Sequence, residues 1–152
     1  MSIDPGVIRS EEHREVGALL QRDAGLLIER WSRRAVAEEP TARRVHHAAL
    51  LDHLPRLLSA LGRSLAESDA EAEGRHAAVA AEHGEQRWEA GWSLPEVVRD
   101  YQILRLVILE YLEENLERPL SGREAMAVGL ALDEAIAASV GKYVTNREEY
   151  VR

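Results

Sequence analysis

Hydrophobic residues recur along this chain at steps of three and four, which is the period of an α-helix with one buried face. Proline, glycine and serine residues interrupt the pattern and divide the chain into five segments, none of which alternates as a β-strand does. The clearest segment places Leu94, Val97, Val98, Tyr101, Leu104, Ile108, Tyr111 and Leu112 on one face. The sequence therefore predicts an all-α domain of about five long helices.

The first two predicted helices cover the amino-terminal part of the chain. Ser10 opens the first helix and Pro40 ends it, and two internal glycines make it breakable. A cap at Thr41 opens the second helix, which reaches about residue 67. We expect this helix to kink at Pro55, because proline cannot donate the backbone hydrogen bond of a helix interior.

Each of the three later helices begins with the pattern of a capping box. In this motif a serine hydroxyl and a glutamate three residues later satisfy each other's free backbone amides. Gly91 is a natural end for the third helix, and Pro119 breaks the chain before the last one. The predicted boxes pair Ser68 with Glu71, Ser93 with Glu96, and Ser121 with Glu124.

The last helix, predicted over about 121–152, keeps its apolar seam to the end of the chain. We expect it to extend toward a further C-terminal module; the alternative is a final helix that docks on its own core. A seam of this kind also suits a parallel homodimer with two-fold symmetry. The residues expected at that interface are Leu132, Ile136, Val140, Tyr143 and Tyr150.

Arg105 lies on the apolar face of the fourth helix, so we expect it to be buried and paired. Its charge cannot be removed at neutral pH, and an unpaired buried charge is strongly unfavourable. His83 and Arg87 precede it at the corner marked by Gly91, and with Asp133 these side chains form the candidate polar cluster. Further candidate counter-ions are Glu82, Asp100 and Glu134.

The candidate polar cluster has two interpretations. It is either a structural knot that locks the corner between the third and fourth helices, or a pocket for a small anion or a carboxylate. In the second case a half-buried histidine can change its charge near neutral pH. Trp88 and Trp92 lie one helical turn apart beside the cluster, and we expect them to be core or interface anchors.

Composition narrows the class of protein. At 152 residues the chain suits one domain, residues 1–152, and it has no cysteine for disulfides or thiolate-bound metals. The sequence shows no leader pattern and no apolar run long enough to span a bilayer, so we expect a cytoplasmic domain without membrane insertion. A net charge of −8 argues against nucleic acid as a partner.

Metal, haem and enzymatic functions have little support in the sequence. A di-iron bundle needs two Glu-x-x-His units, whereas the chain has one, from Glu73 to His76. His76 or His83 could serve as a haem ligand, but there is no phenylalanine to line a haem pocket, and Arg87 shares their stripe. No phosphate loop or nucleophile motif is present, so we expect no cofactor and no catalytic residue. The other histidines considered, His46, His47 and His53, show no repeating ligand geometry.

The stretch from His83 to Leu116 resembles the RsbRD N-terminal domain family, which is named for an RsbT co-antagonist. The pattern that matches is His83, Arg87, Gly91, Leu94, Val98, Tyr101, Leu104 and Arg105. Supporting matches are Trp31, Leu54, Pro55, Leu58, Asp133, Ile136, Ser139, Val140 and Tyr143.

The resemblance implies a fold and a function. The fold is a non-haem, globin-like bundle, and the function is non-catalytic sensing, as in domains at the front of bacterial sensor histidine kinases. The expected partners are a second copy in a homodimer and a downstream kinase or other output domain, which the last helix would reach. The alternatives are a haem- or anion-binding sensor and a free-standing regulator of a stress response.

Overall fold

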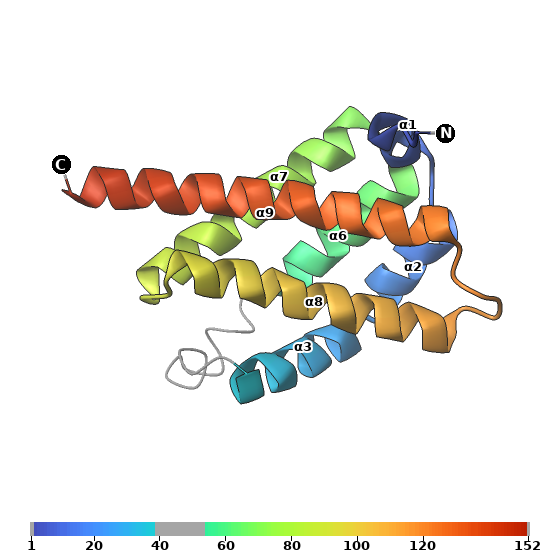
Figure 1. Cartoon of the computed structure of the whole chain (residues 1–152), viewed down its shortest axis with the longest axis horizontal. Helices are drawn as coiled ribbons and strands as arrows, with labels where there is room; N and C mark the ends of the chain where they lie inside the picture. Colours follow the sequence, from blue (N-terminus) through green and yellow to red (C-terminus); the bar gives the residue numbers. More distant parts are fainter. Residues whose placement is uncertain (1, 39–53, 152) are drawn as a thin grey trace.

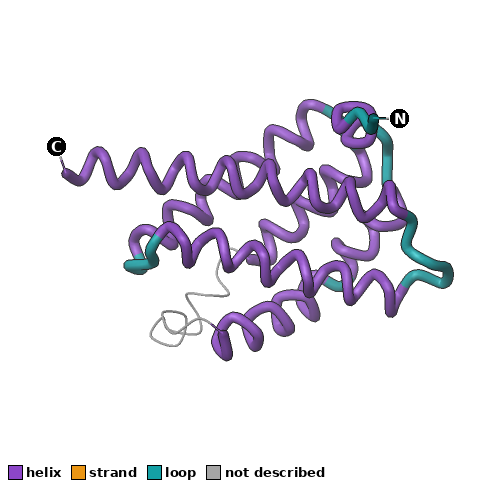
Figure 2. Tube along the Cα trace, viewed as in Figure 1, coloured by secondary structure: helices purple, strands orange, loops and turns teal. Residues whose placement is uncertain are grey.

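A computed structural model of the chain describes residues 2–38 and 54–151. Within these ranges the protein consists of α-helices and connecting loops, with no strand, so the all-α prediction is confirmed (Figures 1 and 2). The described helices are α1 (Pro5–Ser10), α2 (Arg14–Arg22), α3 (Ala24–Glu38), α6 (Leu54–Glu67), α7 (Ala70–Glu89), α8 (Leu94–Asn115) and α9 (Gly122–Val151). None of them is both long enough and apolar enough to cross a membrane.

The first predicted helix is in fact two helices, α2 and α3, and the short helix α1 precedes them. The prediction that Ser10 opens a helix is wrong, because Ser10 ends α1 and its hydroxyl donates to the carbonyl oxygen of Val7 at 2.9 Å. The break between α2 and α3 falls at Asp23, whose side chain accepts hydrogen bonds from Arg22 and Tyr111. The short carboxylate side chain of Asp23 thus accepts hydrogen bonds from side chains at the point where the helix is interrupted.

The second predicted helix is described only from Leu54, where α6 begins. Its expected cap at Thr41 and the preceding Pro40 lie outside the described residues. Pro55 is the second residue of α6. The preceding residues lie outside the described part of the chain, so the kink expected at Pro55 stays a prediction.

Two of the three predicted capping boxes are confirmed. Ser93 and Ser121 each exchange hydrogen bonds with the glutamate three residues later. The box predicted at Ser68 is wrong, because Asp69 is the cap of α7 and accepts from the backbone N–H of Ala72 at 2.7 Å. Ser68 instead has a positive φ of 49° and turns its hydroxyl toward carbonyl oxygens of residues 9 and 11.

The long helices α8 and α9 run antiparallel at the front of the view in Figure 1, and α7 crosses behind α9. The crossing depends on a small residue: a Cβ atom on Gly84 of α7 would overlap the backbone of Ser139 on α9. A similar contact joins α2 to α6, where Gly17 meets the backbone of Gly62. The helices therefore approach closely enough for side chains of α7, α8 and α9 to meet at one corner.

The crossing of α7 and α9 generates a stability prediction with a control on the same helix. Gly84→Ala should lower the free energy of unfolding by about 1–3 kcal/mol, because the new methyl group has no room beside Ser139. Gly74→Ala has nothing within 4 Å of its new Cβ and should instead raise it by about 0.5–1 kcal/mol through helix propensity. Urea unfolding followed by circular dichroism compares the two, and equal effects would contradict the close crossing.

Candidate functional site

The candidate site lies at the corner where α7 ends and α8 begins. Gly91 has φ +83°, a conformation that suits glycine, and its N–H donates to the carbonyl oxygen of Trp88 at 3.0 Å. The N–H of Trp92 donates to the carbonyl oxygen of Arg87, also at 3.0 Å. These two bonds form a Schellman motif, and Ser93 then caps α8. The chain therefore reverses within a few residues and turns the last two turns of α7 toward the start of α8.

Three charged or polar side chains meet inside this corner, and we call His83, Arg87 and Asp100 the corner triad. The Nε2 atom of His83 lies 3.0 Å from Oδ2 of Asp100, and Nε of Arg87 lies 3.4 Å from the same oxygen. All three side chains are almost completely buried, with exposures of 1–3%. The triad joins α7 to α8 through a charge pair that water does not reach.

The carboxyl group of Asp100 is ionised. Burial alone would raise its pKa, but the charge of Arg87 and the hydrogen bond from His83 outweigh burial and hold the pKa below its ordinary value. An ionised carboxylate can only accept hydrogen bonds, so the Nε2 atom of His83 carries a proton and donates it. Arg87 and Asp100 therefore cancel each other's charge within the triad.

Aromatic rings enclose the triad. The ring centroids of Trp31 and Tyr101 lie 5.8 and 5.4 Å from that of His83. The indole N–H of Trp31 also donates to the backbone carbonyl oxygen of Asp100 at 3.0 Å, which fastens α3 to the corner. The triad is thus packed against aromatic side chains.

The corner is connected to α9 through Trp92. The guanidinium carbon of Arg87 lies 4.6 Å from the centroid of the Trp92 ring, a cation–π arrangement. The carbonyl oxygen of Trp92 accepts a hydrogen bond of 2.6 Å from the hydroxyl of Tyr143 on α9. Continuous contact therefore runs from Asp100 through Arg87 and Trp92 to the last third of α9.

Two further contacts hold α9 at this corner. The ring of Trp88 meets the rings of Tyr143 and Tyr150 edge to face, with centroids 5.4 and 5.9 Å apart. The hydroxyl groups of Tyr101 and Ser139 lie 2.5 Å apart, and the Ser139 hydroxyl donates to a backbone carbonyl of α7. Buried tyrosine and serine hydroxyls thus connect α8, α9 and α7.

Arg105 and Asp133 were predicted to join His83 and Arg87, but they form a separate pair. Nη2 of Arg105 lies 2.7 Å from Oδ1 of Asp133, and their side chains are 36% and 61% exposed. The expectation that Arg105 is buried is wrong, because it occupies the edge of the apolar face of α8, where its long side chain reaches solvent beside α9. Its partner, Asp133, is one of the four candidate counter-ions predicted from the sequence.

The other candidate counter-ions separate in the same way. Asp100 belongs to the corner triad, whereas Glu82 pairs with Arg56 and Glu134 pairs with Arg9. The sequence carried a signal for Asp100: it stands on the buried stripe of α8, one residue before Tyr101 and one turn after Val97. An acidic residue on such a stripe requires a cation as partner. The role of the Trp92 carbonyl had no signal in the sequence.

The residues predicted at a dimer interface differ in their exposure. Leu132 and Tyr143 are buried within the chain, where α9 packs on α7 and α8, and they are not available to a second copy. Ile136 and Val140 are half-buried, and Tyr150 is 80% exposed. Of the five residues predicted at the interface, Ile136, Val140 and Tyr150 are therefore the ones that a second copy could contact.

The two histidines considered as haem ligands are engaged by the protein. Nε2 of His76 lies 2.9 Å from the carbonyl oxygen of Ala131, to which it donates, and Nε2 of His83 donates to Asp100. Over residues 2–38 and 54–151 no group of three or more histidine, aspartate or glutamate side chains could hold a metal ion. The remaining candidates, His46, His47 and His53, lie outside the described residues.

Comparison with known proteins identifies the family of the chain. The family described as "RsbT co-antagonist protein rsbRD N-terminal domain" matches residues 25–152, and the chain belongs to it. Domains of this family are non-catalytic sensor or regulatory domains of the stressosome type. No curated protein and no solved structure matches the chain significantly, so the globin-like arrangement stays a prediction.

The burial of the triad predicts a large difference between two arginines of the chain. Arg87→Met should lower the free energy of unfolding by about 3–5 kcal/mol, because Asp100 then loses the positive charge that opposes its own. Arg105→Met removes an exposed pair and should cost less than about 1 kcal/mol. Chemical denaturation of the two variants measures both values. Similar losses would show that the charge of Asp100 is compensated in another way.

His76 predicts a dependence of stability on pH. Burial lowers its pKa below the ordinary value, and the nearby charge of Arg9 acts in the same direction. Unfolding raises the pKa again, so the unfolded chain binds more protons below about pH 6.5. The free energy of unfolding should therefore fall as the pH decreases through 6.5, by up to about 1.4 kcal/mol per pH unit from this group. His76→Gln should reduce that slope; an unchanged slope would show that His76 does not contribute.

Proposed function

We propose that this domain is a sensory and dimerisation module of a bacterial signal-transduction protein. In this proposal a conformational change passes through α9 to an output domain, such as a histidine kinase. Membership of a family of regulatory domains supports the general role. The contacts between the corner triad and α9 support the route.

The observation that carries the proposal is the continuous contact between the triad and α9. Asp100 positions Arg87, Arg87 lies over the ring of Trp92, and the Trp92 carbonyl oxygen holds the hydroxyl of Tyr143. A displacement of α8 at Asp100 cannot occur without moving this chain of partners, because buried charges must stay paired. The triad can therefore bias α9 between two positions, which is what a two-state relay requires.

The shape of α9 suits the role of an output element. It is the longest described helix, with 30 residues, and its final turns project beyond the start of α8 (Figure 1). Tyr150 and Val151 in these turns are 80% and 74% exposed. A change at the corner therefore reaches side chains that are accessible to another protein segment.

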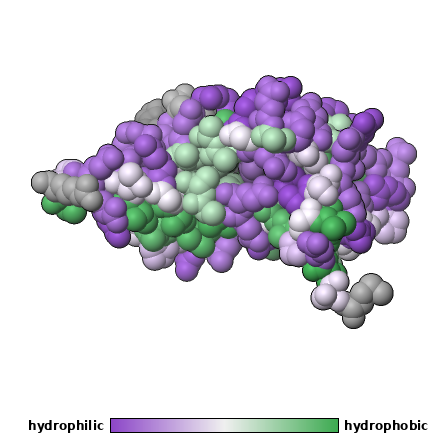
Figure 3. Space-filling view, turned by 90° about the horizontal axis from the view of Figure 1, so that it is seen from above, coloured by the Kyte–Doolittle hydropathy of each residue, from purple (hydrophilic) through white to green (hydrophobic). Residues whose placement is uncertain are grey.

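The exposed part of the α9 seam supports a homodimer. Ile136, Val140 and Val144 are half-buried and follow one another at steps of four residues. The exposed Val151 lies seven residues, or two helical turns, after Val144 and so continues the same stripe. Hydrophobic surface gathers along one edge of the molecule and extends toward its C-terminal end (Figure 3). A parallel pair would place the two ends of α9 side by side, so that both copies move together.

The dimer is tested by size and by distance. Light scattering at micromolar concentration should give twice the mass of the chain. Because the chain has no cysteine, Val151→Cys introduces a single site for a spin label, and pulsed electron resonance should find the two labels close together. A monomeric mass, or labels at opposite ends of a dimer, would contradict the parallel arrangement.

The relay is tested with the same spin label. Asp100→Asn should change the distance distribution between labels at position 151, because it removes the charge that positions Arg87. Asp133→Asn, which makes the same chemical change in the exposed pair, should leave the distribution unchanged. Adding Tyr143→Phe should remove the response to Asp100→Asn, since the bond to Trp92 is lost. A response that persists without the Tyr143 hydroxyl would reject this route.

A further inference from the structure

Two surface features lie apart from the corner triad. A groove of 420 Å³ between α6 and α7 is lined by three arginines, but its positive charge is already opposed within the chain. The pairs are Arg56 with Glu82, Arg63 with Glu67, and Arg75 with Glu71. The second feature is α1, a short helix that is held almost entirely by contacts to other helices.

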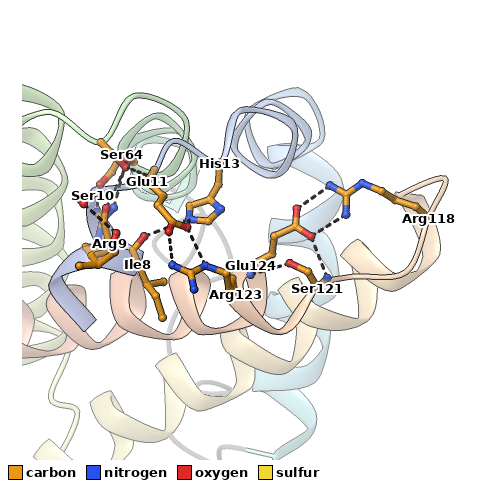
Figure 4. Close-up of polar contacts among 12 residues, drawn as sticks. Ile8, Arg9, Ser10, Glu11, His13, Ser64, Arg118, Ser121, Arg123 and Glu124 are labelled. Carbon is orange, nitrogen blue, oxygen red and sulfur yellow. Dashed lines mark hydrogen bonds and ion pairs between the residues drawn. The ribbon is translucent and has the colours of Figure 1, made fainter. Parts of the chain in front are cut away.

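Two neighbouring side chains anchor α1. Ile8 is 1% exposed and Arg9 is 7% exposed, whereas every other described residue of the helix is exposed. Nε of Arg9 lies 3.0 Å from Oε2 of Glu134 on α9, and Nη1 lies 3.3 Å from the carbonyl oxygen of Ser64 on α6 (Figure 4 shows the Ser64 side). A single guanidinium group therefore ties α9 to α6.

The residues that follow α1 form further ion pairs with the start of α9 and with the loop that precedes it. Glu11 pairs with Arg123, and Glu15 pairs with Arg118 (Figure 4 shows the first pair). The hydroxyl of Ser68, in the loop between α6 and α7, lies 2.8 Å from the carbonyl oxygen of Glu11. Apart from the packing of Ile8, the contacts that hold α1 and the residues after it are polar, and most of them involve exposed side chains.

The energetics of α1 differ from those of the core. A helix of six residues is not stable by itself, so α1 is helical only while it is docked. Exposed ion pairs contribute about 0–1 kcal/mol each, and Ile8 is the one large apolar side chain that α1 buries. Segments with few buried apolar contacts open locally without unfolding the rest of a protein. The segment also precedes residues 25–152, the region that matches the family.

We propose that α1 is a latch that ties α9 to α6 and opens while the other helices stay folded. The closed latch restrains the half of α9 that contains Glu134, and the open latch leaves α9 held by its contacts with α6, α7 and α8. An effect of the latch on signalling requires that α9 is the output helix, and this effect therefore rests on the proposed function. The opening itself does not depend on it.

Hydrogen exchange measured by mass spectrometry on the whole chain tests the latch. Glu134→Gln removes the charge that holds Arg9, and because Glu134 is 42% exposed, the variant is expected to fold. Peptides covering residues 5–11 should exchange at least tenfold faster than in the unmodified protein, with no change in α7 and α8. Asp133→Asn, one residue away with the same loss of charge, should leave the exchange of residues 5–11 unchanged, because Asp133 pairs with Arg105 instead.

Three results would overturn the latch. The amides of α1 could be as protected as those of α7 and exchange only when the core unfolds, which would make α1 part of the core. Glu134→Gln could leave the exchange unchanged, or Asp133→Asn could accelerate it equally. None of these measurements uses the dimer or the label at residue 151, so failure of the latch and failure of the proposed relay are separate outcomes.

Discussion

The buried carboxylate of Asp100 is the constraint on which the corner of this domain depends. It is ionised and 1% exposed, a state that is stable only with positive charge and hydrogen-bond donors directly beside it. Arg87 and His83 supply both from α7, and the indole of Trp31 binds the backbone of the same residue from α3. Asp100 therefore joins α8 to two other helices, to α7 through its carboxylate and to α3 through its backbone carbonyl oxygen.

The corner contacts α9 through a backbone carbonyl oxygen and aromatic rings. Trp92 lies under the guanidinium group of Arg87, and its carbonyl oxygen holds Tyr143. The close crossing at Gly84 keeps α7 and α9 in direct backbone contact beside this point. In the proposed relay α9 is the element that moves, because Trp92 and Tyr143 join it to the corner triad.

Helical periodicity and caps were enough to predict the all-α class and the starts of α8 and α9, because Ser93 and Ser121 act through local bonds. Local patterns failed where distant groups decide. Ser68 turns its hydroxyl to the backbone near α1 and so does not cap α7, and Arg105 stands at the edge of a stripe whose buried width is set by α9. Asp100 was one of four candidate counter-ions, and the turn at Gly91 selects it by bringing the start of α8 to His83 and Arg87.

A double-mutant cycle between Asp100→Asn and Tyr143→Phe tests the central claim most directly. The free energies of unfolding of the protein, both single variants and the double variant give the coupling between the triad and α9. The account predicts non-additivity of more than about 0.5 kcal/mol for this pair, whereas Asp133→Asn combined with Tyr143→Phe should be additive within about that value. Additive effects of Asp100→Asn and Tyr143→Phe would contradict the account, because they would show that α9 is independent of the buried carboxylate.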